Sequence, residues 1–164
     1  MKNIFQLKYF VVIVISLVFF TNALGQLVSP HITNYTPKDY GTLKAPEVWS
    51  ITQDDRGLMY FGMANEIGIF DGESWAFVEV PKAMNITSLK CYKGKVYYGG
   101  YGQFGVLEYD DKGVLTPSLL STSIDFSFDN IWKIHAINDE IYFQCYSFLF
   151  VLQPMLKTNQ KLKL

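Results

Sequence analysis

The sequence predicts an all-β fold, namely a partial β-propeller of about two and a half to three four-stranded antiparallel blades that follows a signal peptide. Residues 48–80, 86–120 and 131–152 repeat one order of features: a short apolar strand, a tight polar turn, an aromatic-rich strand and a strand containing Gly or Phe. The repeats lie 37 positions apart from the first to the second and 45 from the second to the third, which is typical of propeller blades. Helical repeats of similar period would need amphipathic helical patterns, which the sequence lacks.

The composition is that of a globular β-rich protein. The 164 residues carry a net charge of −1, and 49% of them are hydrophobic and 16% aromatic. Binding to nucleic acid needs a basic surface that neutralises phosphates. The composition therefore excludes nucleic acid as a partner of this segment.

Residues 1–25 are predicted to be a signal peptide. Two lysines precede an apolar run at 9–20, and small residues end at Gly25, so signal peptidase is expected to cleave between Gly25 and Gln26. An uncleaved membrane anchor is the weaker interpretation, because a run of about 12 residues is shorter than the roughly 20 that a spanning helix needs. We therefore expect an exported protein.

Residues 26–46 are predicted to be a connecting arm, since three prolines and a glycine interrupt any helix or long strand there. Its segment 34–37 is expected to pack against the first blade or to lend it an edge strand. The first blade, about residues 47–81, is then expected as a complete meander. Its first turn ends in Gly57, which suits the positive φ that closes a hairpin. The expected strands are 48–52, 58–62, 67–71 and 75–80.

The second blade, about residues 85–121, repeats this order with a tighter turn at 93–94, a glycine-rich corner at 99–102 and a turn at 110–113. Glycines at such bends relieve the close approach of neighbouring backbones. The order of its strands is otherwise that of the first blade.

The third blade, about residues 130–154, is cut short. It lacks the glycines that follow the aromatic strand in the first two units, and its last expected strand, 148–152, runs into Pro154. Residues 155–164 are expected to be a disordered tail. Because propellers usually have about four to eight blades, the sequence is interpreted as part of a longer protein.

The first unit has a distinctive amino-acid sequence. It consists of VWSI at 48–51, QD at 53–54, RG at 56–57, YFG at 60–62 and GIFDG at 68–72. This series resembles the repeat of the two-component regulator propellers, the ligand-binding sensor domains of Bacteroidetes-type hybrid two-component and triple-tyrosine regulators. The similarity covers roughly residues 33–152, and the segment NYTPKDYG at 34–41 also looks like the start of such a propeller. The third unit matches only at 131–134 and 141–143.

The resemblance implies an N-terminal fragment of a non-catalytic sensor in a two-component regulatory system. Such a sensor would bind an extracellular ligand, for example a glycan, on the periplasmic or cell-surface side of a Gram-negative bacterium, and would pass on a conformational signal. The family normally continues with a β-sandwich, a membrane helix and a cytoplasmic output such as a histidine kinase, which would be its partners in signal transduction. The alternatives are a secreted propeller enzyme acting on polysaccharide and a protein-binding propeller.

Two tryptophans are the main candidates for ligand binding. Trp49 and Trp132 directly follow the first apolar residue of their units, where the second unit has Thr87. If first strands line a central channel, these rings border its mouth and can stack on a ligand such as a sugar, whereas packing between blades is the alternative. Tyr101, in the glycine-rich corner, is the third candidate.

Other chemistry is not favoured by the sequence. The acid pairs 54–55 and 110–111 could suggest glycoside hydrolysis, but each precedes a turn glycine, where Asp side chains bond the local backbone. The two histidines, at 31 and 135, have no second ligand at metal spacing, so no metal or other cofactor is expected. Export would permit a disulfide between the two cysteines, but these occupy different places in the repeat, which favours free thiols.

Overall fold

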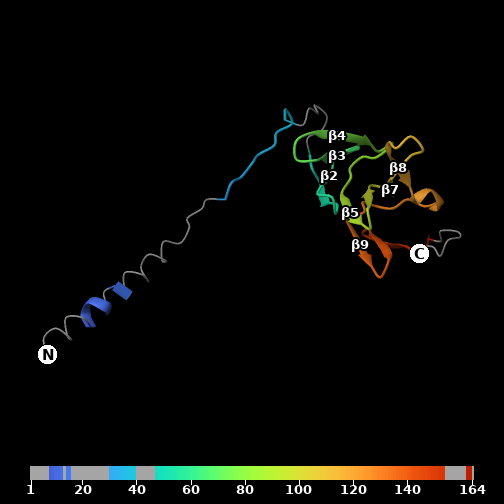
Figure 1. Ribbon diagram of the computed structural model, residues 1–164. Helices are drawn as coiled ribbons and strands as arrows, with labels where there is room; N and C mark the ends of the chain where they lie inside the picture. The colour runs from blue at the N-terminus through green and yellow to red at the C-terminus, as the bar shows by residue number, and fades with distance from the viewer. Residues whose placement is uncertain (1–7, 13, 16–29, 40–46, 154–161, 164) are drawn as a thin grey trace. The chain divides into compact units, whose positions relative to one another are not determined.

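The computed structural model describes part of the chain, namely residues 8–12, 14–15, 30–39, 47–153 and 162–163 (Figure 1). The chain divides into two units, Met1–Asn34 and Tyr35–Leu164, and all of the described strands lie in the second. In the first unit, 8–12 and 14–15 are helical, and none of the described helices is long and apolar enough to cross a membrane. The predicted cleavage site between Gly25 and Gln26 lies outside the described residues, so the signal peptide stays a prediction.

The all-β prediction is confirmed for the described residues of the second unit. Three antiparallel four-stranded sheets follow one another along the chain, and in each sheet every strand pairs with the next (Figure 1). Sheet 1 consists of β1 (Ser50–Gln53), β2 (Met59–Gly62), β3 (Glu66–Phe70) and β4 (Trp75–Glu79). Sheet 2 consists of β5 (Ser88–Tyr92), β6 (Lys95–Gly100), β7 (Gln103–Tyr109) and β8 (Leu115–Leu119). Sheet 3 consists of β9 (Lys133–Ile137), β10 (Glu140–Gln144), β11 (Leu149–Leu152) and β12 (Leu162–Lys163).

Two details differ from the sequence predictions. A short 3-10 helix, η1 (Ser121–Ser123), follows sheet 2. Part of the segment expected as a disordered tail, Leu162–Lys163, instead pairs with β11, because an open strand edge offers unpaired backbone groups to any nearby segment. The strands of the first predicted blade form with bounds shifted by at most two residues.

Strand pairing defines equivalent positions in the three sheets. Tyr60, Tyr97 and Tyr142 each lie on the second strand of a sheet and face the first strand in the same register, opposite Thr52, Lys90 and His135. The repeat in the sequence is therefore a repeat in the structure.

The same pair of hydrogen bonds joins sheet 1 to sheet 2 and sheet 2 to sheet 3. The backbone N–H of Ile86 donates over 2.7 Å to the carbonyl of Met63, the residue after β2, and that of Ile131 donates over 3.1 Å to the carbonyl of Gly100, the last residue of β6. The Ser50 hydroxyl donates to the Ile86 carbonyl at 3.0 Å, and the Ser88 hydroxyl donates to the Ile131 carbonyl at 2.7 Å. As a result β5 contacts both β1 and β9.

Two glycines make these joins possible. A Cβ atom at Gly62 would lie 2.4 Å from the Ile86 carbonyl oxygen, and one at Gly99 would lie 2.6 Å from the Ile131 Cβ. Both distances are below van der Waals contact, so any side chain here would push neighbouring sheets apart.

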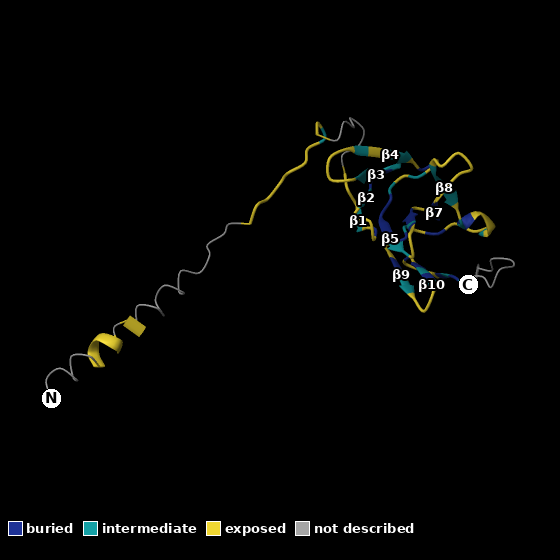
Figure 2. Ribbon diagram, in the orientation of Figure 1, coloured by how far each residue is buried: buried dark blue, intermediate teal, exposed yellow. Residues whose placement is uncertain are grey.

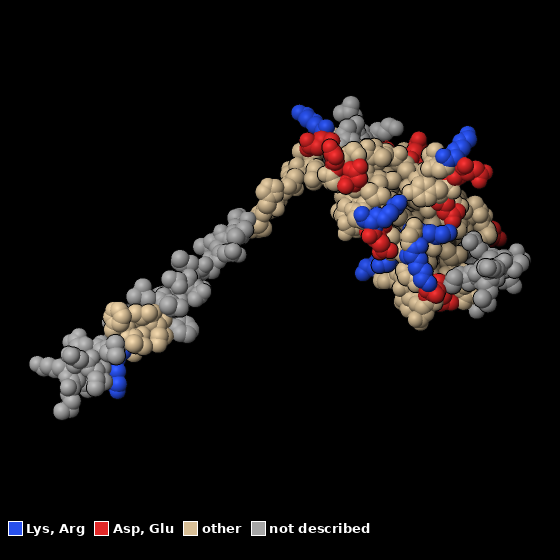
Figure 3. Space-filling model, viewed as in Figure 1, with Lys and Arg blue, Asp and Glu red and all other residues tan. Residues whose placement is uncertain are grey.

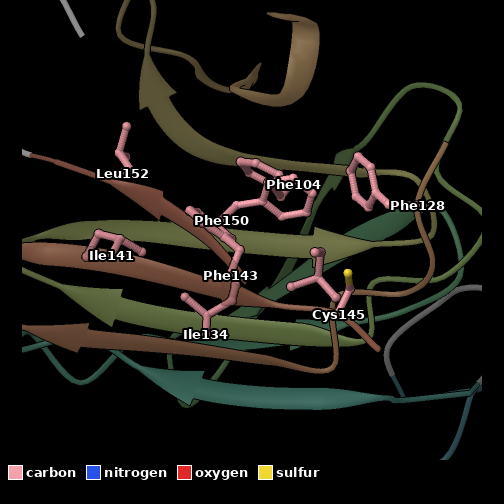
Figure 4. Packing of buried hydrophobic residues seen from close by; sticks show 9 residues of the cluster. Phe104, Phe128, Ile134, Ile141, Phe143, Cys145, Phe150 and Leu152 are labelled. Atoms are coloured by element: carbon pink, nitrogen blue, oxygen red, sulfur yellow. The ribbon is translucent and has the colours of Figure 1, made fainter. Parts of the chain in front are cut away.

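Two apolar cores lie between the sheets, where Figure 2 shows the buried segments. The core between sheets 1 and 2 contains Tyr60, Ile67, Val80, Ile86, Leu89, Val96, Tyr98 and Leu107. The core between sheets 2 and 3, drawn in Figure 4, contains Phe104, Phe128, Ile131, Ile134, Ile141, Phe143, Cys145, Phe150 and Leu152. Phe104 and Phe143 stack there with ring centroids 4.2 Å apart.

Tyr35 of the arm packs on sheet 1, and the two cysteines are not joined to each other. The ring of Tyr35 meets that of Phe70 edge-on at 5.3 Å, so this part of the arm packs on sheet 1 as expected. Cys91 and Cys145 are both free thiols, and only Cys145 is fully buried.

On the face shown in Figure 3, acidic and basic side chains are interspersed, and Lys95 pairs with Glu108 at 2.8 Å.

Candidate functional site

A groove of about 360 Å³ runs across the beginnings of the three sheets. It is lined by Trp49, Ser50, Ile51, Thr87, Ser88, Leu89, Trp132, Lys133, Ile134 and His135. All ten residues belong to the first strands β1, β5 and β9 or directly precede them. The groove exists because the inter-sheet hydrogen bonds hold these three strands next to one another.

The structure brings Trp49 and Trp132 into this one groove. Each backbone N–H donates over 2.8 Å to the carbonyl of the second-strand residue at the same repeat position, which is Gly62 for Trp49 and Gln144 for Trp132. Their side chains are 45% and 51% exposed, so neither indole is buried between sheets. Both rings therefore offer flat apolar surface to a ligand.

The floor between the two indoles is fixed by hydroxyl groups. Thr87 and Ser88 are buried, and their hydroxyls donate to the Ile131 carbonyl over 2.8 and 2.7 Å. A hydroxyl that donates its only hydrogen to the backbone is held in one orientation. Thr87 and Ser88 thus give the groove a rigid floor and join sheet 2 to sheet 3.

The charge of the groove comes from β9. Lys133 and His135 are exposed, and the lining contains no Asp or Glu. A lysine donates up to three hydrogen bonds and accepts none, so this end of the groove suits ligand hydroxyl or carboxylate oxygens. Sequence reasoning missed both residues as lining, although Lys133 directly follows Trp132 and its position could have indicated it.

Tyr101 does not belong to this groove. It follows β6 and forms an isolated antiparallel bridge with Asn130. Gly102, with φ of +65°, turns the chain at this corner. The tyrosine is 52% exposed there, away from the ten groove-lining residues, so the three candidates of the sequence do not form one site.

Asp54, from the first acid pair, binds the backbone of the turn in which it lies. One carboxylate oxygen of Asp54 accepts backbone N–H groups from Arg56 and Leu58, and the other accepts the Arg56 guanidinium at 2.8 Å and the Tyr60 hydroxyl at 3.2 Å. Burial by itself would raise the pKa of Asp54, but these hydrogen bonds outweigh it and lower the pKa below its ordinary value. Burial, together with the Asp54 charge, raises the pKa of Tyr60 to about 12.

The second acid pair behaves in the same way. Asp110 accepts the backbone N–H groups of Lys112 at 2.9 Å and Val114 at 2.8 Å. Asp54 and Asp110, the first residue of each pair, therefore stabilise hairpin turns, as the neighbouring glycines predict. Among the residues that the structure describes, no three His, Cys, Asp or Glu side chains gather where they could hold a metal ion.

Comparison with known proteins adds no family to these observations. A scan against protein-family models gave no match, and a search of curated proteins gave none. The likeness to two-component regulator propellers therefore stays a prediction from the sequence. The groove is a candidate ligand-binding site because of its geometry alone.

Proposed function

We propose that this chain is the exported, ligand-sensing part of a β-propeller regulator of the two-component type. Three sheets joined by one repeated set of hydrogen bonds support an arc of blades in which the first strands face the axis. The groove across β1, β5 and β9 then lies where propellers commonly bind ligands.

The observation that carries the proposal is the pair of half-exposed indoles on one rigid floor. Trp49 and Trp132 are held at equivalent positions by backbone hydrogen bonds, and the hydroxyls between them are already engaged. Flat aromatic rings stack on the apolar faces of sugar rings, while Lys133 can donate to sugar oxygens. A glycan is therefore the ligand class that fits best.

Sensing is favoured over polysaccharide cleavage because of where the carboxylates lie. Glycoside hydrolysis usually needs two carboxyl groups on either side of the scissile bond. Asp54 and Asp110 instead bind the amides of their own turns, and the groove lining holds no carboxylate. In this proposal, ligand binding favours one of two arrangements of the sheets, and the change passes to downstream parts of the regulator.

Tryptophan fluorescence tests the proposal, because two of the three tryptophans line the groove. The chain would be titrated with cellohexaose, xylohexaose, mannohexaose and trigalacturonate. We expect a saturable change with at least one sugar. The affinity for that sugar should fall about fivefold in Trp49→Ala and in Trp132→Ala, since losing one stacking contact costs roughly 1 kcal/mol.

Trp75→Phe is the matched control. Trp75 stacks on Phe70 with centroids 4.7 Å apart and is not part of the groove lining. Its substitution should leave sugar binding unchanged and should remove background fluorescence. Equal sugar affinity in the parent and in both groove variants would refute the site.

A further inference from the structure

The two cores show that each sheet has a front face and a rear face. We define the front face as the one that packs on the preceding sheet and the rear face as the one that packs on the following sheet. The front faces of sheets 2 and 3 carry Leu89, Val96, Tyr98, Leu107, Ile134, Ile141, Phe143, Phe150 and Leu152. The rear faces of sheets 1 and 2 carry Tyr60, Ile67, Tyr97 and Phe104.

The front face of sheet 1 has the same positions but lacks a preceding sheet among the described residues. Tyr35 of the arm contacts this face on the outer strands β3 and β4, at Phe70 and Trp75, and leaves β1 uncovered. Ile51 pairs with Phe61 as Leu89 pairs with Tyr98 and as Ile134 pairs with Phe143. Leu89 and Ile134 are 9% and 7% exposed, whereas Ile51 is 56% exposed. The position that is buried in the cores of sheets 2 and 3 is therefore solvent-exposed in sheet 1.

The rear face of sheet 3 shows the complementary exposure. Leu149 pairs with the last residue of β10 as Phe104 pairs with Gly99 and Ile67 with Gly62. Ile67 and Phe104 are 0% exposed, whereas Leu149 is 51% exposed. Leu149 also borders a depression of about 650 Å³ that Tyr142, Phe148 and Ile137 help to line.

We propose that these two faces bind each other in two copies of the chain, so that the rear face of sheet 3 in one copy receives the front face of sheet 1 in the other. The contact continues an interface that the chain already uses twice, between sheets 1 and 2 and between sheets 2 and 3. Ile51 on one face and Ile137 and Leu149 on the other are exposed apolar residues, and exposed apolar surface at the edge of an established interface marks an interaction surface.

The number of copies follows from the symmetry of the contact. Because the two faces differ, the contact is head-to-tail, and such contacts close into a ring when the rotation permits. With the three sheets of the described residues, two copies supply six, within the roughly four to eight blades of known propellers, while three copies would exceed that range. The pairing itself depends only on the equivalent faces, and the number two rests on the proposed propeller.

The contact between copies should be weaker than the joins within one chain. Lys133 and Gln144 stand where Ser88 and Gly99 stand in sheet 2, as their pairing shows. The glycine that permits close approach and the serine that donates across the join are therefore missing at this end. We expect a pair that forms at high protein concentration and dissociates on dilution.

The test uses the full chain, produced with its own leader in an exporting bacterium, and measures mass by light scattering after gel filtration. Ile51→Glu and Leu149→Glu place a charge on one face each, and Val114→Glu is the control because Val114 is 55% exposed in the turn before β8. We expect the parent and the control to have twice the mass of one chain and each face variant to have the mass of one.

Mixing the two face variants separates a head-to-tail contact from any other. Ile51→Glu keeps an intact rear face on sheet 3, and Leu149→Glu keeps an intact front face on sheet 1, so the mixture should recover a species of two chains. A parent that is monomeric at its highest soluble concentration overturns the proposal and leaves these faces to other segments or partners. Variants that still self-associate, or that stay monomeric when mixed, also overturn it.

A cross-link provides a test that does not depend on disrupting the faces. Between sheets 1 and 2 the Cys91 N–H donates to the Thr52 hydroxyl over 3.1 Å, and the equivalent positions across two copies are Gln53 and His135. Gln53→Cys mixed with His135→Cys should give a two-chain band on a non-reducing gel under mild oxidation. The mixture should give at least tenfold more of this band than either variant alone, and an equal yield from all three samples would contradict the pairing. Loss of sugar binding with intact pairing would overturn the proposed function but not this contact.

Discussion

The equivalence of the sheets predicts that one substitution will have different costs at matched positions. Phe143 on β10 and Phe61 on β2 occupy the same place in their sheets, since they pair with Ile134 and Ile51. Phe143 is 0% exposed and stacks on Phe104 at 4.2 Å, whereas Phe61 is only half-buried beside Trp75. Truncation to alanine should therefore cost far more at Phe143.

The magnitudes follow from burial. Removing a fully buried Phe ring loses its transfer free energy and leaves a cavity, together about 3–5 kcal/mol. At Phe61 the ring keeps part of its contact with water and no closed cavity results, so we expect about 1–2 kcal/mol. Because a domain of this size is stable by roughly 5–15 kcal/mol, Phe143→Ala should remain folded but lose a large share of its stability.

Urea unfolding followed by circular dichroism measures both values. The protein would be dilute enough to be monomeric, so that contacts between copies do not add to the stability of the Phe61 site. The midpoint should fall for both variants with little change in the slope, and the free energies of unfolding should differ by about 1–4 kcal/mol. Equal losses at the two positions would refute the assignment of buried and open faces.

Two further predictions concern the joins and the turns. Gly99→Ala should cost about 1–3 kcal/mol in thermal or urea unfolding, because the new Cβ would lie 2.6 Å from that of Ile131; unchanged stability would contradict the close join. The pKa of Asp54 is lowered in the folded chain, so its carboxylate contributes stability above the ordinary carboxyl pKa, and this contribution is lost as pH falls through the lowered value. Asp54→Asn should accordingly flatten the acid limb of the stability-against-pH curve, and an unaltered limb would show that other carboxyls determine it.

Much of the fold could be predicted from sequence because the signals are local. Alternating apolar residues and turn glycines such as Gly57 and Gly94 mark hairpins within a few residues of where they act. The repeat then assigns equivalent strands, which is why Trp49 and Trp132 could be given equivalent positions, although their position left a shared channel mouth and packing between blades both open. Tyr101 shows the limit, because the direction of a corner residue depends on the bridge to Asn130, nearly thirty positions away.

The contacts between sheets were beyond sequence reasoning for the same reason. Nothing local indicates that the Ser50 hydroxyl will donate to the Ile86 carbonyl, since the two residues meet only after both sheets have formed. Likewise, the burial of Leu89 and the exposure of Ile51 depend on the neighbouring sheet and not on either residue, which are both aliphatic.

The hydrogen bonds that hold sheet 2 to sheet 3 lie directly beside Trp132, one of the two groove tryptophans. The Ile131 carbonyl accepts hydroxyl groups from both Thr87 and Ser88, and Trp132 follows directly in the chain. A ligand that stacks on Trp132 therefore acts on the residue next to the hydrogen bonds that fix the spacing of sheets 2 and 3. Because these hydrogen bonds end on the residue before Trp132, a displacement of β9 would strain or break them. In the proposed sensor, a ligand bound at Trp132 would therefore act on the bonds between sheets 2 and 3, and this is the coupling that such a sensor requires.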